Sequence, residues 1–141
     1  MIDEFLDDGQ DSAGALADVA RIERLLHDYA AARRDVSYSE MLLTLGFRFT
    51  RPKMRALCRT LDEVDRRAAA AGQPELAVLV VRESDRLPGQ GWWTGRRDYQ
   101  GQWTGSEARA FLDRIQHAAF DYWQGRAPMP NTPARNTKED M

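Results

Sequence analysis

The sequence predicts an α+β fold with a winged-helix-like helix-turn-helix core, a short sheet and a packed C-terminal helix. Three observations support this prediction. Apolar residues recur at helical spacing in several segments, and two of these segments are separated by capping signals and a glycine. In addition, one short apolar run is rich in valine. The chain has 141 residues, of which 43% are hydrophobic. That is enough to form the core of one domain.

We place this domain at residues 15–124. Residues 1–14 are acidic and poor in apolar groups, and residues 125–141 hold three prolines, so both segments are expected to be disordered. The beginning of the chain lacks the basic and then apolar pattern of a signal peptide, and no apolar run approaches the roughly 20 residues of a membrane span. A cytoplasmic location without a membrane partner is therefore expected.

The first three helices are expected at Leu16–Arg33, Ser37–Leu45 and Arg51–Ala71. Ser37 and Glu40 have the spacing of a capping box, in which the serine hydroxyl accepts a first-turn N–H and the glutamate reaches back to the serine N–H. Thr50 can cap the third helix in a similar way. The buried stripe of that helix is expected to hold Met54, Leu57, Cys58, Leu61, Val64 and Ala68.

The second half of the domain is less regular. Leu76–Arg82 is a short apolar run with three valines, which predicts a buried strand. Arg82–Gly105 combines glycines with aromatic residues and is expected to form an irregular loop or hairpin. A last helix is expected at Ser106–Trp123, capped by Ser106.

Charge is distributed unevenly along the chain. The net charge is −2, which argues against a protein that binds nucleic acid over its whole surface. The first 20 residues hold six acids and no lysine or arginine. These acids either contact a basic partner surface or only solvate the chain end. Residues 46–60 hold no acid, and their basic side chains are Arg48, Arg51, Lys53, Arg55 and Arg59.

The basic residues of the third helix indicate a nucleic-acid interface. Arg51, Arg55 and Arg59 fall on one stripe about 80° wide, away from the apolar stripe. Two helices joined by a turn with Gly46, the second helix basic near its start, are typical of a helix-turn-helix that enters the major groove. The alternative is a solvated helix face, on which Arg59–Glu63 and Asp62–Arg66 form ordinary four-residue ion pairs.

Two sequence segments carry a family resemblance. Val-Ser-Tyr-Ser-Glu-Met at 36–41 and Arg-Ala-Leu-Cys-Arg-Thr-Leu at 55–61 resemble the helix-turn-helix of alkylguanine-DNA alkyltransferases and alkyltransferase-like proteins. The resemblance covers roughly residues 36–93 and includes a proline-led segment ending in Val-Val, followed by a glycine-rich loop. It implies a winged helix that binds DNA, damaged or structured DNA in particular, with Tyr38 at a phosphate and Arg55 in the base stack.

The chain also departs from this family. The alkyl-acceptor motif Pro-Cys-His-Arg-Val is absent, because Pro74 is followed by Glu75, Leu76 and Ala77, so methyl transfer to this protein is not expected. Cys58 stands where the family has a glycine, and its place in the apolar stripe predicts a buried, unreactive thiol. The order of these motifs also resembles that in small bacterial proteins of unassigned function. This second resemblance gives no indication of an activity.

The aromatic loop offers alternatives. Trp92, Trp93 and Trp103, interleaved with Arg96 and Arg97, could stack on bases, cover the core, or anchor another protein or a second copy of the chain. An enzyme acting through the Pro88–Trp93 loop is a third alternative and is not favoured. No motif indicates a metal site, a cofactor or a catalytic residue.

The sequence therefore favours a non-catalytic module that binds nucleic acid, with DNA as the expected partner. The alternative function is a protein-interaction or oligomerising module that uses the tryptophan-rich loop. The candidate nucleic-acid-binding residues are Tyr38, Arg51, Lys53, Arg55, Arg59, Arg96 and Arg97.

Overall fold

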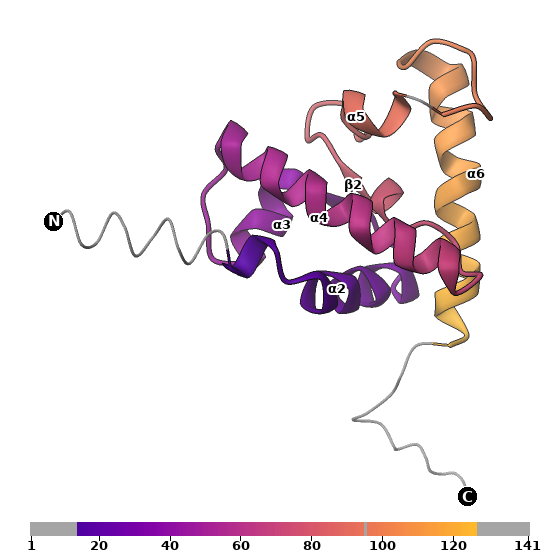
Figure 1. The fold of residues 1–141 in the computed structure, drawn as a ribbon. Coiled ribbons are helices and arrows are strands. Elements are labelled where there is room, and N and C mark those ends of the chain that lie inside the picture. Colours follow the sequence, from indigo (N-terminus) through magenta and orange to yellow (C-terminus); the bar gives the residue numbers. More distant parts are fainter. Residues whose placement is uncertain (1–13, 95, 127–141) are drawn as a thin grey trace, which may run out of the picture.

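The computed structural model describes residues 14–94 and 96–126, and these residues combine α and β structure with helices dominating (Figure 1). The expected α+β class is confirmed. The expected acidic arm and tail lie almost wholly outside the described residues. In chain order the elements are α2 (Val19–Ala31), β1 (Val36–Ser37), α3 (Tyr38–Thr44), α4 (Arg51–Ala70), the 3-10 helix η1 (Ala77–Leu79), β2 (Val80–Val81), α5 (Gln90–Trp93) and α6 (Gly105–Gln124).

The core lies where α2 meets α4 and α6 (Figure 1). Ile22, Leu26 and Ala30 form the buried stripe of α2, and Leu112 and Ala119 are among the buried residues of α6, which packs on α2. These side chains are fully buried, and apolar burial on this scale is the main stabilising contribution to a domain of this size.

The helix starts follow local capping rules. Asp18 caps α2 through the Arg21 N–H, so this helix begins after Asp18 and not at Leu16, although residues 14–16 form a helical turn of their own. The capping box at the start of α3 is confirmed: Ser37 accepts from the Glu40 N–H at 3.0 Å, and the Glu40 carboxylate accepts from the Ser37 N–H at 2.9 Å. Thr50 caps α4 as expected.

The predicted strand at Leu76–Arg82 is wrong over its first half. Ala77–Leu79 form the 3-10 helix η1, and only Val80–Val81 are extended. The cause is Asp65 on α4, whose Oδ1 accepts the N–H groups of Leu76 at 2.7 Å and Ala77 at 2.9 Å. These two amides are therefore not available for a strand ladder, and the backbone turns here instead of extending.

The sheet of the described residues is a single parallel pairing, Val36 with Val80 and Ser37 with Val81. It joins the segment before α3 to the segment after η1. The glycine-rich segment that was expected to form a loop or hairpin contains the short helix α5 and turns, without strand structure among its described residues. The final helix α6 begins at Gly105, so Ser106 lies in its first turn and does not cap it. None of the described helices has the length and apolar character needed to cross a membrane.

Candidate nucleic-acid interface

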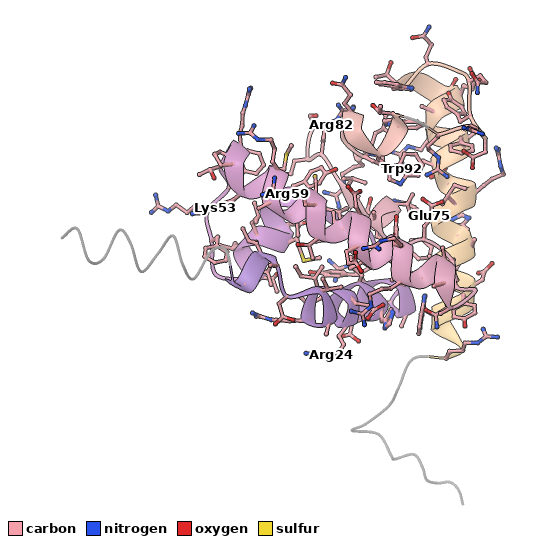
Figure 2. All side chains as sticks on the ribbon, in the orientation of Figure 1. Arg24, Lys53, Arg59, Glu75, Arg82 and Trp92 are labelled. Atoms are coloured by element: carbon pink, nitrogen blue, oxygen red, sulfur yellow. The ribbon has the colours of Figure 1, made fainter. Side chains whose placement is uncertain are left out.

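The exposed side of α4 carries the arginine stripe that the sequence predicts. Arg51, Arg55 and Arg59 are all exposed, while Leu57, Leu61 and Val64 on the opposite side are buried. Arg48 is exposed in the turn that leads into α4. We call Arg48, Arg51, Arg55 and Arg59 the basic face (Arg59 is labelled in Figure 2). Arg48 was not among the predicted site residues, although it lies in the acid-free segment that indicated the site.

The basic face forms no ion pair with any other residue that the structure describes. The pairs Arg59–Glu63 and Asp62–Arg66, which the solvated-face alternative expected, do not form, and Glu63 pairs with Arg66 instead. Other arginines do find partners: Arg33 meets Asp121 at 2.8 Å, and Arg67 meets Glu23 at 3.1 Å. Within the described part of the chain, the basic face thus concentrates unneutralised positive charge.

Lys53 lies apart from the arginine stripe. It is two residues from Arg51, which turns its side chain to a different side of α4. There its ammonium group lies 5.2 Å from the centre of the Phe47 ring, a cation–π contact that covers the apolar core beneath. Two large apolar residues are exposed at this end of the helix pair, Leu43 at 70% and Phe49 at 45%.

Tyr38 is in the interior and does not join the basic face. Its ring is buried, and its hydroxyl accepts the N–H of Gly89 at 2.9 Å. Burial raises the pKa of the Tyr38 hydroxyl to about 12. A Cβ at residue 89 would lie 3.2 Å from that hydroxyl oxygen, which explains the glycine there. Tyr38 therefore fastens the glycine loop to α3, a position from which it does not reach a phosphate.

Cys58 is half-buried on α4 beside Tyr38. We expected a mostly buried thiol, and the structure leaves part of the side chain accessible. Burial still raises the pKa of the thiol, because the charged thiolate loses its hydration there. The environment of Cys58 thus favours the unreactive thiol form.

Arg96 is committed to a structural contact. Its guanidinium binds the Glu75 carboxylate with two hydrogen bonds of 2.8 and 2.9 Å and Asp98 with a further ion pair at 3.0 Å. It also lies 4.1 Å from the centre of the Trp92 ring. Hydrogen bonding to Glu75 raises the pKa of this already basic group further. Arg96 ties the segment after α5 to the segment that leads into η1, whereas Arg97 is exposed.

The aromatic loop mostly covers the core. Trp93 is 3% exposed and donates its ring N–H to the Pro88 carbonyl at 3.2 Å. Trp92 packs edge-on against Trp93 and near Phe111 of α6. Only Trp103 of the three predicted loop tryptophans is exposed, at 39%. The structure brings Trp92 and Trp93 together as part of the fold, and it leaves Trp103 apart from them at the surface.

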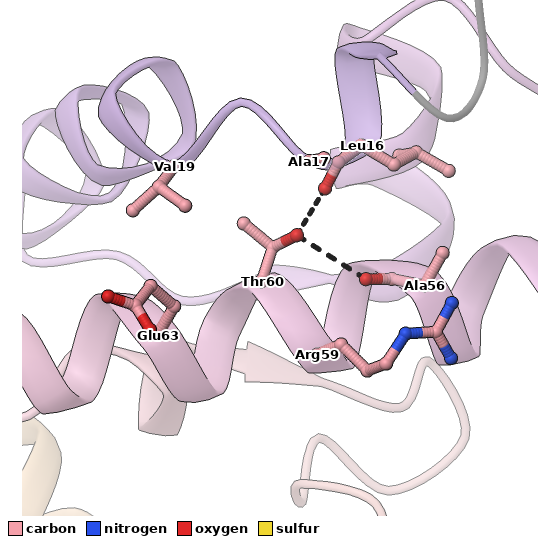
Figure 3. Close-up of a pocket in the computed structure, with 7 residues that line it drawn as sticks. All are labelled: Leu16, Ala17, Val19, Ala56, Arg59, Thr60 and Glu63. Carbon is pink, nitrogen blue, oxygen red and sulfur yellow. Dashed lines mark hydrogen bonds between the residues drawn. The ribbon is translucent and has the colours of Figure 1, made fainter. Parts of the chain in front are cut away.

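A shallow groove of about 410 Å³ runs beside the basic face (Figure 3). The groove is lined on the α4 side by Ala56, Arg59, Thr60 and Glu63, and on the other side by Leu16, Ala17 and Val19. The Thr60 hydroxyl donates to the Leu16 carbonyl across the groove, which holds residues 14–17 against α4. No sequence signal indicated this groove, because its two walls are far apart along the chain.

No cluster of three or more histidine, cysteine, aspartate or glutamate side chains able to hold a metal ion occurs in the described residues. A comparison of the chain with models of protein families, with curated proteins and with solved structures found no match. The resemblance to alkyltransferase-like proteins therefore stays a prediction from sequence, and the basic face is the feature on which a functional proposal can rest.

Proposed function

We propose that this protein binds duplex DNA through the basic face of α4, with a binding and not a catalytic role. The observation that carries the proposal is the group of four exposed arginines that have no acidic partner in the described residues. A phosphate backbone can neutralise these side chains without first breaking an intramolecular ion pair. The proposal includes the helix-turn-helix arrangement of α3 and α4 and a cytoplasmic location.

The chemistry of the basic face fits a phosphate backbone. The guanidinium groups of Arg51 and Arg55 project from the first turns of α4, where the unpaired backbone N–H groups of a helix also favour anions. Arginine can fork onto phosphate oxygens or onto the edge of guanine. The buried stripe of α4 packs on α2 and α3, so these arginines stand on a fixed support.

The distribution of charge, and not its sum, determines which surface meets DNA. The chain carries −2 overall, so binding is expected to depend on a local concentration of positive charge. Phosphate contacts should therefore be confined to the basic face, and affinity should depend steeply on salt because each neutralised phosphate releases counterions.

The test is a titration of a fluorescent duplex with the full chain at several salt concentrations between about 50 and 200 mM. The test variant is Arg51→Ala with Arg55→Ala. The matched control is Arg24→Ala with Arg34→Ala, which removes the same charge from exposed positions in and after α2, on another side of the domain (Arg24 is labelled in Figure 2). A mismatched duplex and a single strand are titrated in parallel.

We expect the test variant to weaken duplex binding and to flatten the log–log salt slope by about one to two units, at roughly 0.9 for each lost phosphate contact. The control should behave like the unmodified chain. Equal losses in both variants would refute a specific interface at α4. Absence of binding to any of the three nucleic acids at low salt would refute the proposal and favour a protein-interaction role, for which Trp103 supplies an exposed anchor.

A further inference from the structure

The first residues that the structure describes lie beside the basic face. Leu16 and Ala17 line the same groove as Arg59, and the Thr60 hydroxyl holds the Leu16 carbonyl against α4 (Figure 3). The described part of the chain therefore begins next to α4.

The composition of residues 1–13 is complementary to that face. Acids occupy five of these positions, and the segment has no lysine or arginine; the acids are Asp3, Glu4, Asp7, Asp8 and Asp11. The basic face has the opposite composition and has no ion-pair partner among the described residues. Opposite charges held in proximity by a short tether attract each other at high effective concentration.

The dimensions permit the contact. Arg51 and Arg59 are eight residues apart on a helix, or roughly 12 Å at 1.5 Å per residue. Residues 3–11 span up to roughly 26 Å when extended, at about 3.3 Å per residue. The acidic segment can therefore run along the whole arginine stripe without displacing the turn at residues 14–16.

We infer that residues 3–11 dock on the basic face of the same molecule and compete there with DNA. This inference rests on the proposed function for its consequence, but the docking itself is independent of DNA. Exposed ion pairs are individually weak, so the acidic segment acts as a partial competitor that a polyphosphate displaces. Binding would then require a local phosphate density high enough to exchange for the segment.

The experiment compares two full-length variants with the same net charge. In the test variant the acidic segment is neutralised by Glu4→Gln, Asp7→Asn, Asp8→Asn and Asp11→Asn. In the control, four acids elsewhere are neutralised by Asp28→Asn, Glu83→Gln, Glu139→Gln and Asp140→Asn. The structure places Asp28 and Glu83 at exposed positions without an ion pair in the described residues.

The first measurement contains no DNA. Backbone amide spectra should show shifts at residues 51–60 in the test variant and not in the control, and these shifts should not depend on protein concentration. Unchanged spectra at α4 would overturn the inference. Shifts that grow with protein concentration would also overturn it, because they would place the segment on a second copy of the chain.

The second measurement is duplex affinity. The test variant should bind duplex DNA about tenfold more tightly than the control at low salt. The reason is the loss of four competing ion pairs, each of which changes the affinity by less than a factor of two. The difference between the two variants should shrink as the salt concentration rises. Equal affinity of the two variants would overturn competition for DNA. If no variant binds DNA, the proposed function fails, and the amide spectra still decide whether the segment docks.

Discussion

Asp65→Asn should make the protein more stable at neutral pH. Burial raises the pKa of the Asp65 carboxyl to about 6 from its ordinary 3.8. Hydrogen bonds from the N–H groups of Leu76 and Ala77 lower this pKa but only partly offset the effect of burial. An asparagine side chain can keep its carbonyl oxygen at the same two amides and cannot ionise. It therefore avoids the cost of placing a charge at this site.

The magnitude follows from the difference between the folded and unfolded pKa values. Because the folded pKa is the higher one, the stabilisation associated with protonated Asp65 is full below about pH 4 and is lost as pH rises to about 6. Two pKa units correspond to about 3 kcal/mol. The asparagine variant should thus gain up to about 3 kcal/mol in the free energy of unfolding at pH 7, and close to nothing at pH 4.

Urea unfolding of both proteins from pH 4 to pH 8 measures this difference directly. Asp62→Asn, at an exposed position on the same helix, is the matched control and should show no comparable gain. Asp65→Ala should be destabilised by about 1–3 kcal/mol at pH 4, since it leaves the amides of Leu76 and Ala77 without their acceptor, and at pH 8 the removal of the buried charge should offset that loss. A stability difference between Asp65→Asn and the unmodified chain that is the same at pH 4 and pH 8 would refute the reasoning.

Three further predictions concern contacts inside the domain. The ring centroids of His27 and Trp123 lie 3.7 Å apart, and burial lowers the pKa of His27. The free energy of unfolding should therefore be greatest above about pH 6.5 and decrease as the pH falls below it, because the unfolded chain takes up the proton first. In His27→Phe, unfolding measured over the same pH range should not show this decrease. Tyr38→Phe removes the acceptor of the Gly89 N–H and should cost about 1–3 kcal/mol, with faster hydrogen exchange at the Gly89 amide. Arg96→Ala should lower the free energy of unfolding by about 2 kcal/mol, measured by thermal unfolding, and leave DNA affinity nearly unchanged. A loss of affinity as large as that of Arg51→Ala with Arg55→Ala would show that Arg96 contacts DNA.

Local signals in the sequence predicted the starts of α3 and α4. The capping box of Ser37 and Glu40 and the Thr50 cap involve residues three positions apart, so their geometry follows from the helix itself. The exposed stripe of Arg51, Arg55 and Arg59 was predictable for the same reason, because helical periodicity alone places these positions on one side.

The errors trace to partners that are distant in the chain. The apolar run at 76–81 predicts a strand, but its first half turns because an aspartate on α4 accepts hydrogen bonds from its amides. Arg96 lies among aromatic residues as expected, but its guanidinium meets Glu75, 21 residues earlier. Tyr38 is buried because Gly89 folds over it. None of these contacts has a periodicity or spacing from which it could have been read.

The small sheet has a consequence for how this chain folds. Its two strands, of two residues each, close a long loop that contains both α3 and α4. Closing such a loop costs entropy that a ladder of this length cannot repay, whereas α3 and α4 begin from contacts close in sequence. The pairing of Val36 with Val80 should therefore form late, after the helices have packed. It connects parts of the domain that are already folded and is not the nucleus of folding.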